Sequence, residues 1–311
     1  MSNEESSAIV ALSNSLTAAV ESAGRHIVTV TARRRGSASG IVWRKGIVVT
    51  ADHVVERDDG ITVRTGPGDP VTATLAGRDP TTDIAVLKVP ESDSDQAAAV
   101  STEPAAVGQL VAAVGRPGES GLSVSFGAVS SVGPEWRTWG GGRIDQLVRP
   151  QVTFYPGFSG GALIDMSGRV LGMNTSGLSR GMDVTIPAGT LNRVVDQLLK
   201  TGRIAPGFLG VRMQSVDVSE SVRSAMGIEP GQGLLVVGVE DDGPAAKAGL
   251  MVGDVLLSID GKRVGQPDAV AAILDPDKVG KQVALRVSRG GNPQELTAVV
   301  AERPHRRHHH G

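Results

Sequence analysis

The sequence predicts a mainly β protein in two parts, an all-β barrel or sandwich followed by a smaller α+β module. Three observations support this fold class. Short β-branched runs separated by Gly, Pro and Asp extend from Ile27 to Ile186, and closely spaced strands of this kind are typical of barrels and sandwiches. A helical spacing of apolar residues interrupts the pattern at 191–200. Beyond Pro206, strand and helix periods are mixed.

Taken in order, the first part begins with an amphipathic lead-in helix over Ala8–Val20 that ends near Gly24. Strands follow, and the part closes with a helix over Leu191–Lys200, for which Gly202 is the stop. The predicted strands are 27–31, 40–43, 47–50, 61–64, 71–79, 84–89, 110–115, 122–132, 145–152, 161–165, 169–174 and 182–186.

The module after the boundary is about 100 residues long, enough for a core of its own. Its predicted strands are 209–213, 234–239, 255–259, 283–289 and 297–301, and its predicted helices are 219–226, 244–248 and 267–274. We therefore expect five segments: a lead-in helix (1–25), a first domain (26–200), a linker (201–206), a second domain (207–302) and a His/Arg-rich disordered tail (303–311).

Composition excludes several function classes. The 31 Lys and Arg nearly balance the 33 Asp and Glu, so the electrostatic footprint of nucleic-acid binding is missing. Without cysteine, the chain has no disulfide, thiolate metal site or cysteine nucleophile. No window approaches the length of a membrane-spanning helix, and the N-terminal segment does not read as a secretory signal. A cytoplasmic location is the expectation, with export as the alternative if the N-terminus has been trimmed.

Ser159 is the candidate nucleophile, because glycines flank it on both sides and glycine lets backbone amides approach a substrate closely. A serine hydroxyl needs a base to remove its proton and a third group to orient that base. Four of the six histidines lie in the last seven residues, which leaves His26 and His53. His26 precedes the first strand and reads as a solvated or capping residue, so His53, with Asp83, completes the candidate constellation.

Around these residues the chain resembles the HtrA/Deg group of trypsin-like serine proteases. The resemblance covers about residues 27–300 and includes segments on both sides of the predicted domain boundary. The segments that carry it are Ala51-Asp52-His53-Val54-Val55, Thr82-Asp83-Ile84-Ala85, Ala113-Val114-Gly115-Arg116-Pro117, Pro156-Gly157-Phe158-Ser159-Gly160-Gly161, Gly168-Arg169-Val170-Leu171-Gly172-Met173-Asn174, Gly207-Phe208-Leu209-Gly210-Val211 and the stretch 240–260.

The resemblance implies a trypsin-like double β-barrel protease domain followed by an α+β PDZ domain. It implies a triad of Ser159 as nucleophile, His53 as base and Asp83 as its orienting acid, without a metal or other cofactor. The amides of Gly157 and Ser159 would form the oxyanion hole. Met182, Asp183 and Val184 would line the specificity pocket, with an apolar preference favoured over a basic one drawn by Asp183.

For the second domain, the resemblance implies binding of peptide C-termini at Phe208, Leu209, Gly210 and Val211, with Val270 and Leu274 on the facing wall. The expected function is ATP-independent cleavage of unfolded or damaged proteins in quality control. A homo-oligomer is expected, and a trimer is the family's common form, although the first 42 residues contain no aromatic anchor.

Departures from the family pattern leave alternatives open. Phe158 and Tyr155 replace asparagines, so the loop around Ser159 either switches between conformations or uses these rings, with Phe154, to fill the gap between the barrels. One competing hypothesis is a proteolytically silent scaffold or holdase chaperone. A second is a metal-dependent protein that uses the His-rich tail.

Overall fold

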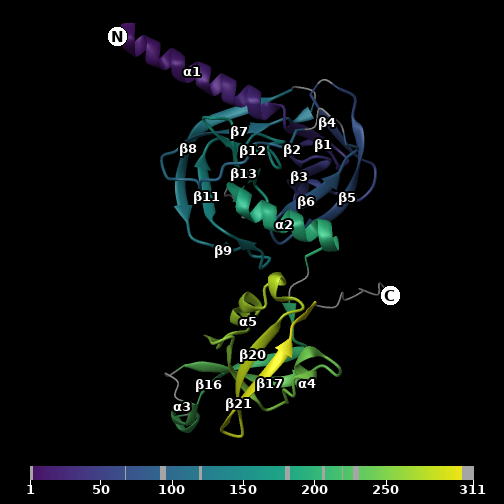
Figure 1. The fold of residues 1–311 in the computed structure, drawn as a ribbon, viewed down its shortest axis with the longest axis vertical. Helices are drawn as coiled ribbons and strands as arrows, with labels where there is room; N and C mark the ends of the chain where they lie inside the picture. The colour runs from purple at the N-terminus through teal and green to yellow at the C-terminus, as the bar shows by residue number, and fades with distance from the viewer. Residues whose placement is uncertain are drawn as a thin grey trace. The chain divides into compact units, whose positions relative to one another are not determined.

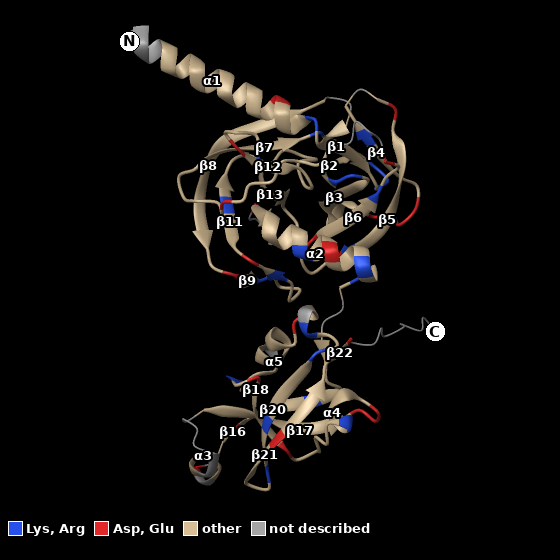
Figure 2. Ribbon diagram, in the orientation of Figure 1, with Lys and Arg blue, Asp and Glu red and all other residues tan. Residues whose placement is uncertain are grey.

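The computed structural model describes residues 3–66, 68–91, 96–118, 121–178, 183–204, 207–218, 220–226 and 231–302. It divides into two compact units, Met1–Ile204 and Ala205–Gly311. Figure 1 shows the first unit as barrels with one helix across them, and the second as a twisted sheet with short helices. Acidic and basic residues are interspersed over both units in Figure 2.

The first unit contains two closed antiparallel barrels. In the first barrel the strand order is β1-β2-β3-β6-β5-β4, and in the second it is β11-β14-β13-β12-β7-β8. The strands are β1 (Ile27–Thr31), β2 (Ala38–Arg44), β3 (Ile47–Ala51), β4 (Ile61–Thr65), β5 (Val71–Asp79), β6 (Ile84–Lys88), β7 (Leu110–Gly115), β8 (Ser123–Gly133), β11 (Leu147–Gln151), β12 (Ala162–Asp165), β13 (Val170–Thr175) and β14 (Val184–Pro187).

One hydrophobic core joins the two barrels. Ile41, Val49 and Val86 from the first barrel belong to the same buried cluster as Val114 and Ile186 from the second. Burial of this shared apolar surface is the main force that holds the barrels against each other. A cleft that draws residues from both barrels is therefore supported by a common core.

Helix α2 (Ala188–Thr201) packs against β5 and β6 of the first barrel and β13 and β14 of the second. Its apolar side chains recur at helical spacing and are buried, as the sequence predicts for 191–200. Trp43 Nε1 donates to Asn192 Oδ1 at 2.9 Å, tying the helix to β2. The helix ends at Gly202, which adopts the left-handed conformation (φ 73°) that favours glycine.

The N-terminal helix α1 (Asn3–Gly24) is longer than the predicted 8–20. Its last turns pack on the barrels through Ala19 and Ala23, which are buried, while Ile9, Val10 and Leu12 are exposed. Figure 1 shows the remainder of the helix projecting from the barrels. Among the described residues, no helix is both long and apolar enough to cross a membrane.

The sequence patterns missed a small hairpin, β9 (Trp136–Arg137) and β10 (Arg143–Ile144). Its strands are two residues long and its turn is built from glycines, so no period is available to detect. Thr138 Oγ1 donates to the carbonyl of Thr81 at 2.6 Å. A Cβ on Gly142 would lie 2.4 Å from the same carbonyl oxygen, so the hairpin rests directly on the turn before Asp83.

The second unit is built on a sheet of order β16-β17-β18-β20-β21, with β19 beside β18 and a separate pair β15-β22. Its core contains Leu234, Ile259, Val264, Val283 and Val287. The elements are β15 (Gly207–Phe208), β16 (Val211–Asp217), α3 (Glu220–Met226), β17 (Gln232–Val239), α4 (Pro244–Lys247), β18 (Val255–Ile259), β19 (Lys262–Arg263), α5 (Pro267–Ile273), β20 (Gln282–Arg289), β21 (Asn292–Val299) and β22 (Ala301–Glu302), with a 3-10 turn η3 at Pro276–Lys278.

A buried ion pair stabilises this second unit. Arg289 binds the two carboxylate oxygens of Asp254 through two nitrogens, each at 2.8 Å, and the amide of Met251 also donates to Asp254 at 2.8 Å. Burial raises the pKa of Asp254, but these hydrogen bonds outweigh burial and hold the pKa below its ordinary value.

Asp254→Asn should therefore lower the thermal stability of the protein at neutral pH. A depressed pKa in the folded state contributes stability above the unfolded-state pKa of about 3.9, and that stability is lost as pH falls through the folded-state value. The difference in Tm between parent and variant should shrink toward zero in acid. Asp241→Asn, at an exposed carboxylate, is the control, and a difference for Asp254→Asn that stays constant from pH 7 to pH 2 would contradict the account.

Phe158 does not fill the gap between the barrels, which corrects that hypothesis for this residue. Phe158 is fully buried inside the second barrel with Val111, Ala113 and Leu163. Tyr155 is half exposed and meets Phe158 edge to face, with ring centroids 5.3 Å apart. Phe158 therefore anchors the loop to the core of one barrel.

Phe158→Ala should destabilise the protein by about 3–5 kcal/mol, because it removes a buried aromatic side chain and leaves a cavity. Tyr155→Ala removes the partner ring from an exposed site and should cost about 1 kcal/mol. Denaturant unfolding of the two variants gives both values. Equal losses would show that the loop is not anchored through Phe158.

Candidate functional site

The base of the candidate site, His53, lies in the 3-10 turn η1 (Asp52–Val54) that directly follows β3. Its ring Nδ1 lies 2.9 and 3.0 Å from the two carboxylate oxygens of Asp83, and its backbone amide donates to Asp83 Oδ1 at 2.8 Å. An ionised carboxylate can only accept hydrogen bonds. The proton is therefore on Nδ1, and Nε2 is left as the basic nitrogen.

Asp83 lies in the turn immediately before β6 and has an unusual backbone conformation. Its φ is +57°, in the left-handed region that non-glycine residues seldom adopt. The preceding turn is stabilised by the buried Asp79, whose carboxylate accepts hydrogen bonds from the Thr81 amide and from the hydroxyls of Thr81 and Thr82. The turn thus aims a buried carboxylate at His53.

Strand β13 of the second barrel also contacts the Asp83 carboxylate. Thr175 Oγ1, at the end of β13, donates to Asp83 Oδ2, and the Gly177 amide donates to the same hydroxyl oxygen at 2.9 Å. A Cβ on Gly177 would lie 2.5 Å from His53 Nδ1 and 2.7 Å from Asp83 Oδ2. Only glycine lets the chain pass so close to the pair.

Ser159 lies in the loop between β11 and β12 and is 9% exposed. Its Oγ is 3.2 Å from Ser176 Oγ, and among the described residues no hydrogen bond joins it to His53. Catalytic hydrogen bonds are often long in ligand-free structures and shorten when substrate binds. The structure therefore shows the His53–Asp83 bond formed and the serine hydroxyl bonded to a neighbouring hydroxyl.

The loop presents two amides that no described backbone carbonyl accepts, those of Gly157 and Ser159. Gly157 has φ +87°, and a Cβ there would lie 2.5 Å from Pro117 Cβ. Two amides of this kind beside a nucleophile can stabilise the negative charge that develops on a carbonyl oxygen.

Ser39 of β2, which is not among the predicted site residues, ties this loop to the first barrel. Its hydroxyl donates to the Gly157 carbonyl at 2.7 Å and accepts from the Arg116 amide at 2.8 Å. Its own amide donates to the Ser159 carbonyl at 3.2 Å. The two carbonyls are thereby held in place by hydrogen bonds from the first barrel.

The predicted pocket residues are only partly described. Met182 lies outside the described residues. Asp183 is half-buried and Val184 is buried. Burial raises the pKa of Asp183 above its ordinary value. His26 lies apart from the triad, with its Nδ1 2.7 Å from the Gln96 carbonyl oxygen.

In the second unit, the predicted peptide-binding residues 208–211 lie where β15 meets β16, whereas Val270 lies in α5 and Leu274 directly follows it. Phe208 and Val211 are half-buried, whereas Leu209, Val270 and Leu274 are buried in the core. The carbonyls of Leu209 and Gly210 accept from Ala245 and Glu240, while the amides of Leu209 and Gly210 reach no described backbone acceptor. β16 is also an edge strand of its sheet, so it can accept a further strand.

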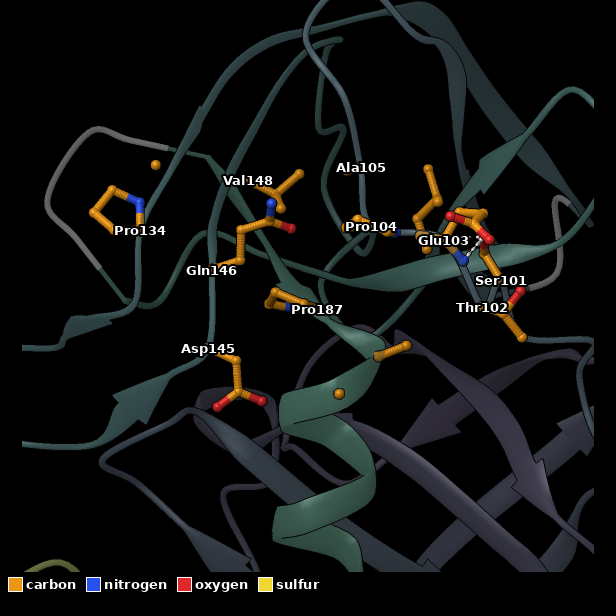
Figure 3. Close-up of a pocket in the computed structure, with 14 residues that line it drawn as sticks. Ser101, Thr102, Glu103, Pro104, Ala105, Pro134, Asp145, Gln146, Val148 and Pro187 are labelled. Carbon is orange, nitrogen blue, oxygen red and sulfur yellow. Dashed lines mark hydrogen bonds between the residues drawn. The ribbon is translucent and has the colours of Figure 1, made fainter.

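A cavity of about 470 Å³ lies elsewhere in the first unit and contains none of the predicted site residues. Figure 3 shows it beside the start of α2, between the 101–105 segment and the chain that leads into β11. Two acidic residues line it, Glu103 and Asp145, and Asp145 is paired with Arg193 at 3.2 Å and Arg143 at 3.5 Å.

Within the described ranges, no group of three or more His, Asp or Glu side chains is placed to hold a metal ion. The His/Arg-rich tail, 303–311, on which the metal hypothesis depends, lies outside the described residues.

Comparison with known proteins identifies both units. The family model of the trypsin-like peptidase domain matches residues 38–173, and that of the PDZ domain matches residues 207–300. The solved structure of the HtrA-type protease AlgW with a tripeptide is 30% identical, with a TM-score of 0.70, over 93% of this chain and 98% of that chain. AlgW with a decapeptide is 27% identical, with a TM-score of 0.72, over 93% and 99%.

Curated relatives agree. A probable periplasmic serine endoprotease, DegP-like, from Brucella suis is 36% identical over 271 residues, which cover 85% of this chain and 52% of that protein. The protein of the same description from Halomonas elongata is 35% identical over 277 residues, 87% of this chain and 57% of that protein. The chain thus spans about half the length of the curated relatives it matches.

The names of these relatives overturn the expected cytoplasmic location, because they are periplasmic proteins. The expectation depended on N-terminal residues that do not read as a secretory signal, and such an observation carries no positive information about the compartment. The family of the chain follows from three findings that agree with one another. The two domain models match in the expected order, the first unit is a double barrel, and a solved HtrA-type structure is 30% identical over 93% of this chain. The chain belongs to the HtrA-type proteases, which join a trypsin-like peptidase domain to a PDZ domain.

Proposed function

We propose that the chain is an ATP-independent serine endopeptidase that cleaves unfolded or damaged polypeptides and binds their C-termini through its PDZ domain. The observation that carries the proposal is the His53 imidazole, bonded through Nδ1 to the buried Asp83 carboxylate. This bond leaves Nε2 basic, and Ser159 lies on the glycine loop with two unpaired amides. In this proposal residues 26–200 form the protease domain and residues 207–302 the PDZ domain.

In the acylation step, Ser159 Oγ attacks the carbonyl carbon of the scissile peptide bond while His53 Nε2 takes its proton. The carbonyl π electrons move to oxygen, and the amides of Gly157 and Ser159 donate to that oxyanion. When the tetrahedral adduct collapses, His53 gives its proton to the leaving amine. Asp83 stabilises the imidazolium throughout, without itself being protonated.

In deacylation, water takes the place of the leaving amine. His53 removes a proton from the water as it attacks the acyl-enzyme, and the same two amides hold the second oxyanion. The proton then returns to Ser159 Oγ and the peptide acid leaves. For acylation, Ser159 Oγ must turn from Ser176 toward His53 Nε2.

Residues 182–184 are proposed to line the specificity pocket. The buried Val184 supports an apolar preference for the residue before the scissile bond. The raised pKa of Asp183 supports the same preference, because desolvation disfavours a negative charge that could attract a basic side chain.

The PDZ domain is proposed to bind a peptide as an added strand along β16, with the terminal carboxylate at the amides of Leu209 and Gly210. The solved relatives named above carry bound peptides. Capture of a substrate tail raises its effective concentration at the protease domain of the same chain.

Assembly into a homo-oligomer, with a trimer as the leading form, is part of the proposal. Exposed Ile9, Val10 and Leu12 on α1 support it, since a helix face of this kind is stabilised by burial against a partner. The names of the curated relatives favour action in the periplasm.

Ser159→Ala and His53→Ala should each reduce casein hydrolysis by about 10⁶-fold, since triad members act as a unit. His26→Ala, at the other histidine in the described residues, should retain parental rates. Labelling of Ser159 by a fluorophosphonate measures assembly of the triad without a protein substrate. Equal hydrolysis by parent and Ser159→Ala would support the silent scaffold or holdase alternative instead.

Gly210→Ala should weaken binding of a fluorescent peptide with a free C-terminus by about tenfold. Gly210 has φ +76°, and a side chain there strains the loop whose amides meet the carboxylate. Gly249→Ala is the matched control, because Gly249 has φ +80° and no atom within 4 Å of an added Cβ. Similar losses in both variants, or equal affinity for the amidated peptide, would reject the carboxylate site.

A further inference from the structure

A second carboxylate is buried beside the His53–Asp83 pair, and the mechanism above does not use it. Asp52 immediately precedes His53 in η1, and its side chain is 9% exposed. The Asp52 amide donates to the Asp83 carbonyl at 3.1 Å, so the segments that carry His53 and Asp83 are joined by their backbones at this residue.

Burial raises the pKa of Asp52, and the nearby Asp83 and Asp79 act in the same direction, while Arg78 opposes them. The charge on this carboxylate is close enough to the Asp83 carboxylate for the two to repel. Left unbalanced, it would add a second negative charge to the surroundings of the imidazole.

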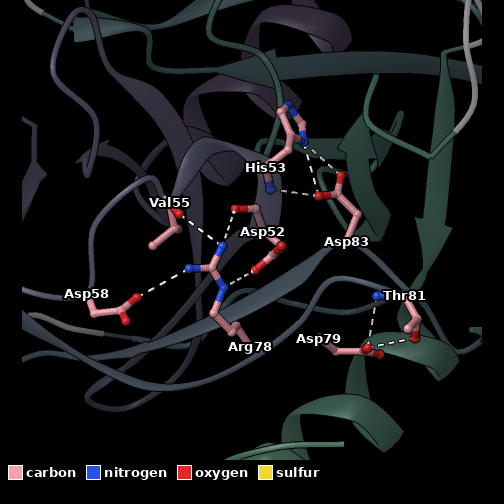
Figure 4. A network of polar contacts seen from close by, with 8 residues as sticks. All are labelled: Asp52, His53, Val55, Asp58, Arg78, Asp79, Thr81 and Asp83. Carbon is pink, nitrogen blue, oxygen red and sulfur yellow. Dashed lines mark hydrogen bonds and ion pairs between the residues drawn. The ribbon is translucent and has the colours of Figure 1, made fainter. Parts of the chain in front are cut away.

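Arg78, near the end of β5, lies against this carboxylate. Its Nε is 2.5 Å from Asp52 Oδ1, and another of its nitrogens is 3.0 Å from the Val55 carbonyl oxygen. A third nitrogen is 3.3 Å from Asp58, whose side chain is 77% exposed. Figure 4 shows the guanidinium between Asp52 and Asp58, on the side of Asp52 away from the His53–Asp83 pair.

The arrangement is asymmetric in charge. Among the residues that the structure describes, the charged groups in contact with His53 or its turn are Asp83 on one side and the Asp52–Arg78 pair on the other, with Asp58 exposed to solvent. Asp79, the other acidic residue that raises the pKa of Asp52, accepts hydrogen bonds from the hydroxyls of Thr81 and Thr82. Asp52 and Arg78 together are neutral, so one net negative charge, that of Asp83, acts on the imidazole.

We propose that Asp52 and Arg78 are positioning residues that set the protonation equilibrium of His53. Arg78 cancels the charge of Asp52, so that the negative charge of Asp83 alone acts on the imidazole. The inference rests on the proposed protease function. It assigns a catalytic consequence to two residues that make no described contact with Ser159.

The test is the pH dependence of fluorophosphonate labelling of Ser159 in the full chain. His53 is active when neutral, so the acid limb of the labelling rate reports its protonation. Asp52→Asn removes the anion and leaves Arg78, and the added net positive charge disfavours the imidazolium. The acid limb should move to lower pH by about half a unit, which makes labelling on that limb about threefold faster.

Two further variants separate the effect of charge on His53 from effects of the substitutions on the structure. The double variant Asp52→Asn with Arg78→Met removes both charges and should return the acid limb to its parental position. Asp58→Asn removes an exposed carboxylate that also contacts Arg78, and should leave the limb unchanged because solvent screens that charge.

The inference is overturned if Asp52→Asn labels with the parental pH profile, or if the double variant shifts as far as Asp52→Asn. If a variant labels too slowly to measure, the titration midpoint of His53 is measured instead by NMR in carbon-13 histidine-labelled protein, and the same criteria apply. The His53 resonance is assigned by its loss in His53→Ala. Failure of the proposed function is a separate outcome, because the parent would then not label at any pH.

Discussion

The hydrogen bonds of Ser39 are the constraint on which the active-site geometry depends. Ser39 belongs to the first barrel, yet its hydroxyl and amide hold the carbonyls of Gly157 and Ser159 in the loop of the second. It is completely buried, so water does not compete for these bonds. Since Thr50 Oγ1 in turn donates to the Ser39 carbonyl at 2.7 Å, the strand before His53 is connected to the same network.

Packing and hydrogen bonding fix the loop from opposite sides. Phe158 holds it in the core of the second barrel, and Ser39 holds it against the first. Between these anchors the chain needs left-handed conformations at Gly157 and Gly160, and a Cβ on Gly160 would lie 2.1 Å from the Ser39 carbonyl oxygen. The residue before Ser159 is therefore free to be aromatic, provided that its side chain points into the barrel.

Much of this organisation could be predicted from the sequence, because it depends on short-range patterns. The strands of both barrels and the helix after them follow from β-branched runs and from the spacing of Leu191 to Leu198. The motifs around His53, Asp83 and Ser159 named the family. The positions of His53, Asp83 and Ser159 relative to one another could be predicted only from the resemblance to the family.

The contributions of Ser39, Thr175 and Arg78 could not be predicted, since each acts on residues far away in the sequence. Ser39 and Gly157 are 118 positions apart, and Thr175 and Asp83 are 92 apart. No local period or motif records such a contact. The packing of Phe158 was missed for the same reason, because an aromatic residue in a glycine-rich loop has no pattern that tells which core it will enter.

The division of the site between two barrels has a consequence for when the protein could be active. His53 and Asp83 belong to the first barrel and Ser159 to the second, and their shared core forms only when the barrels dock. A nascent chain that has completed only its first barrel holds the proposed base and acid without the proposed nucleophile. We expect the proposed proteolytic activity to appear only in a late step of folding, after the two barrels have docked.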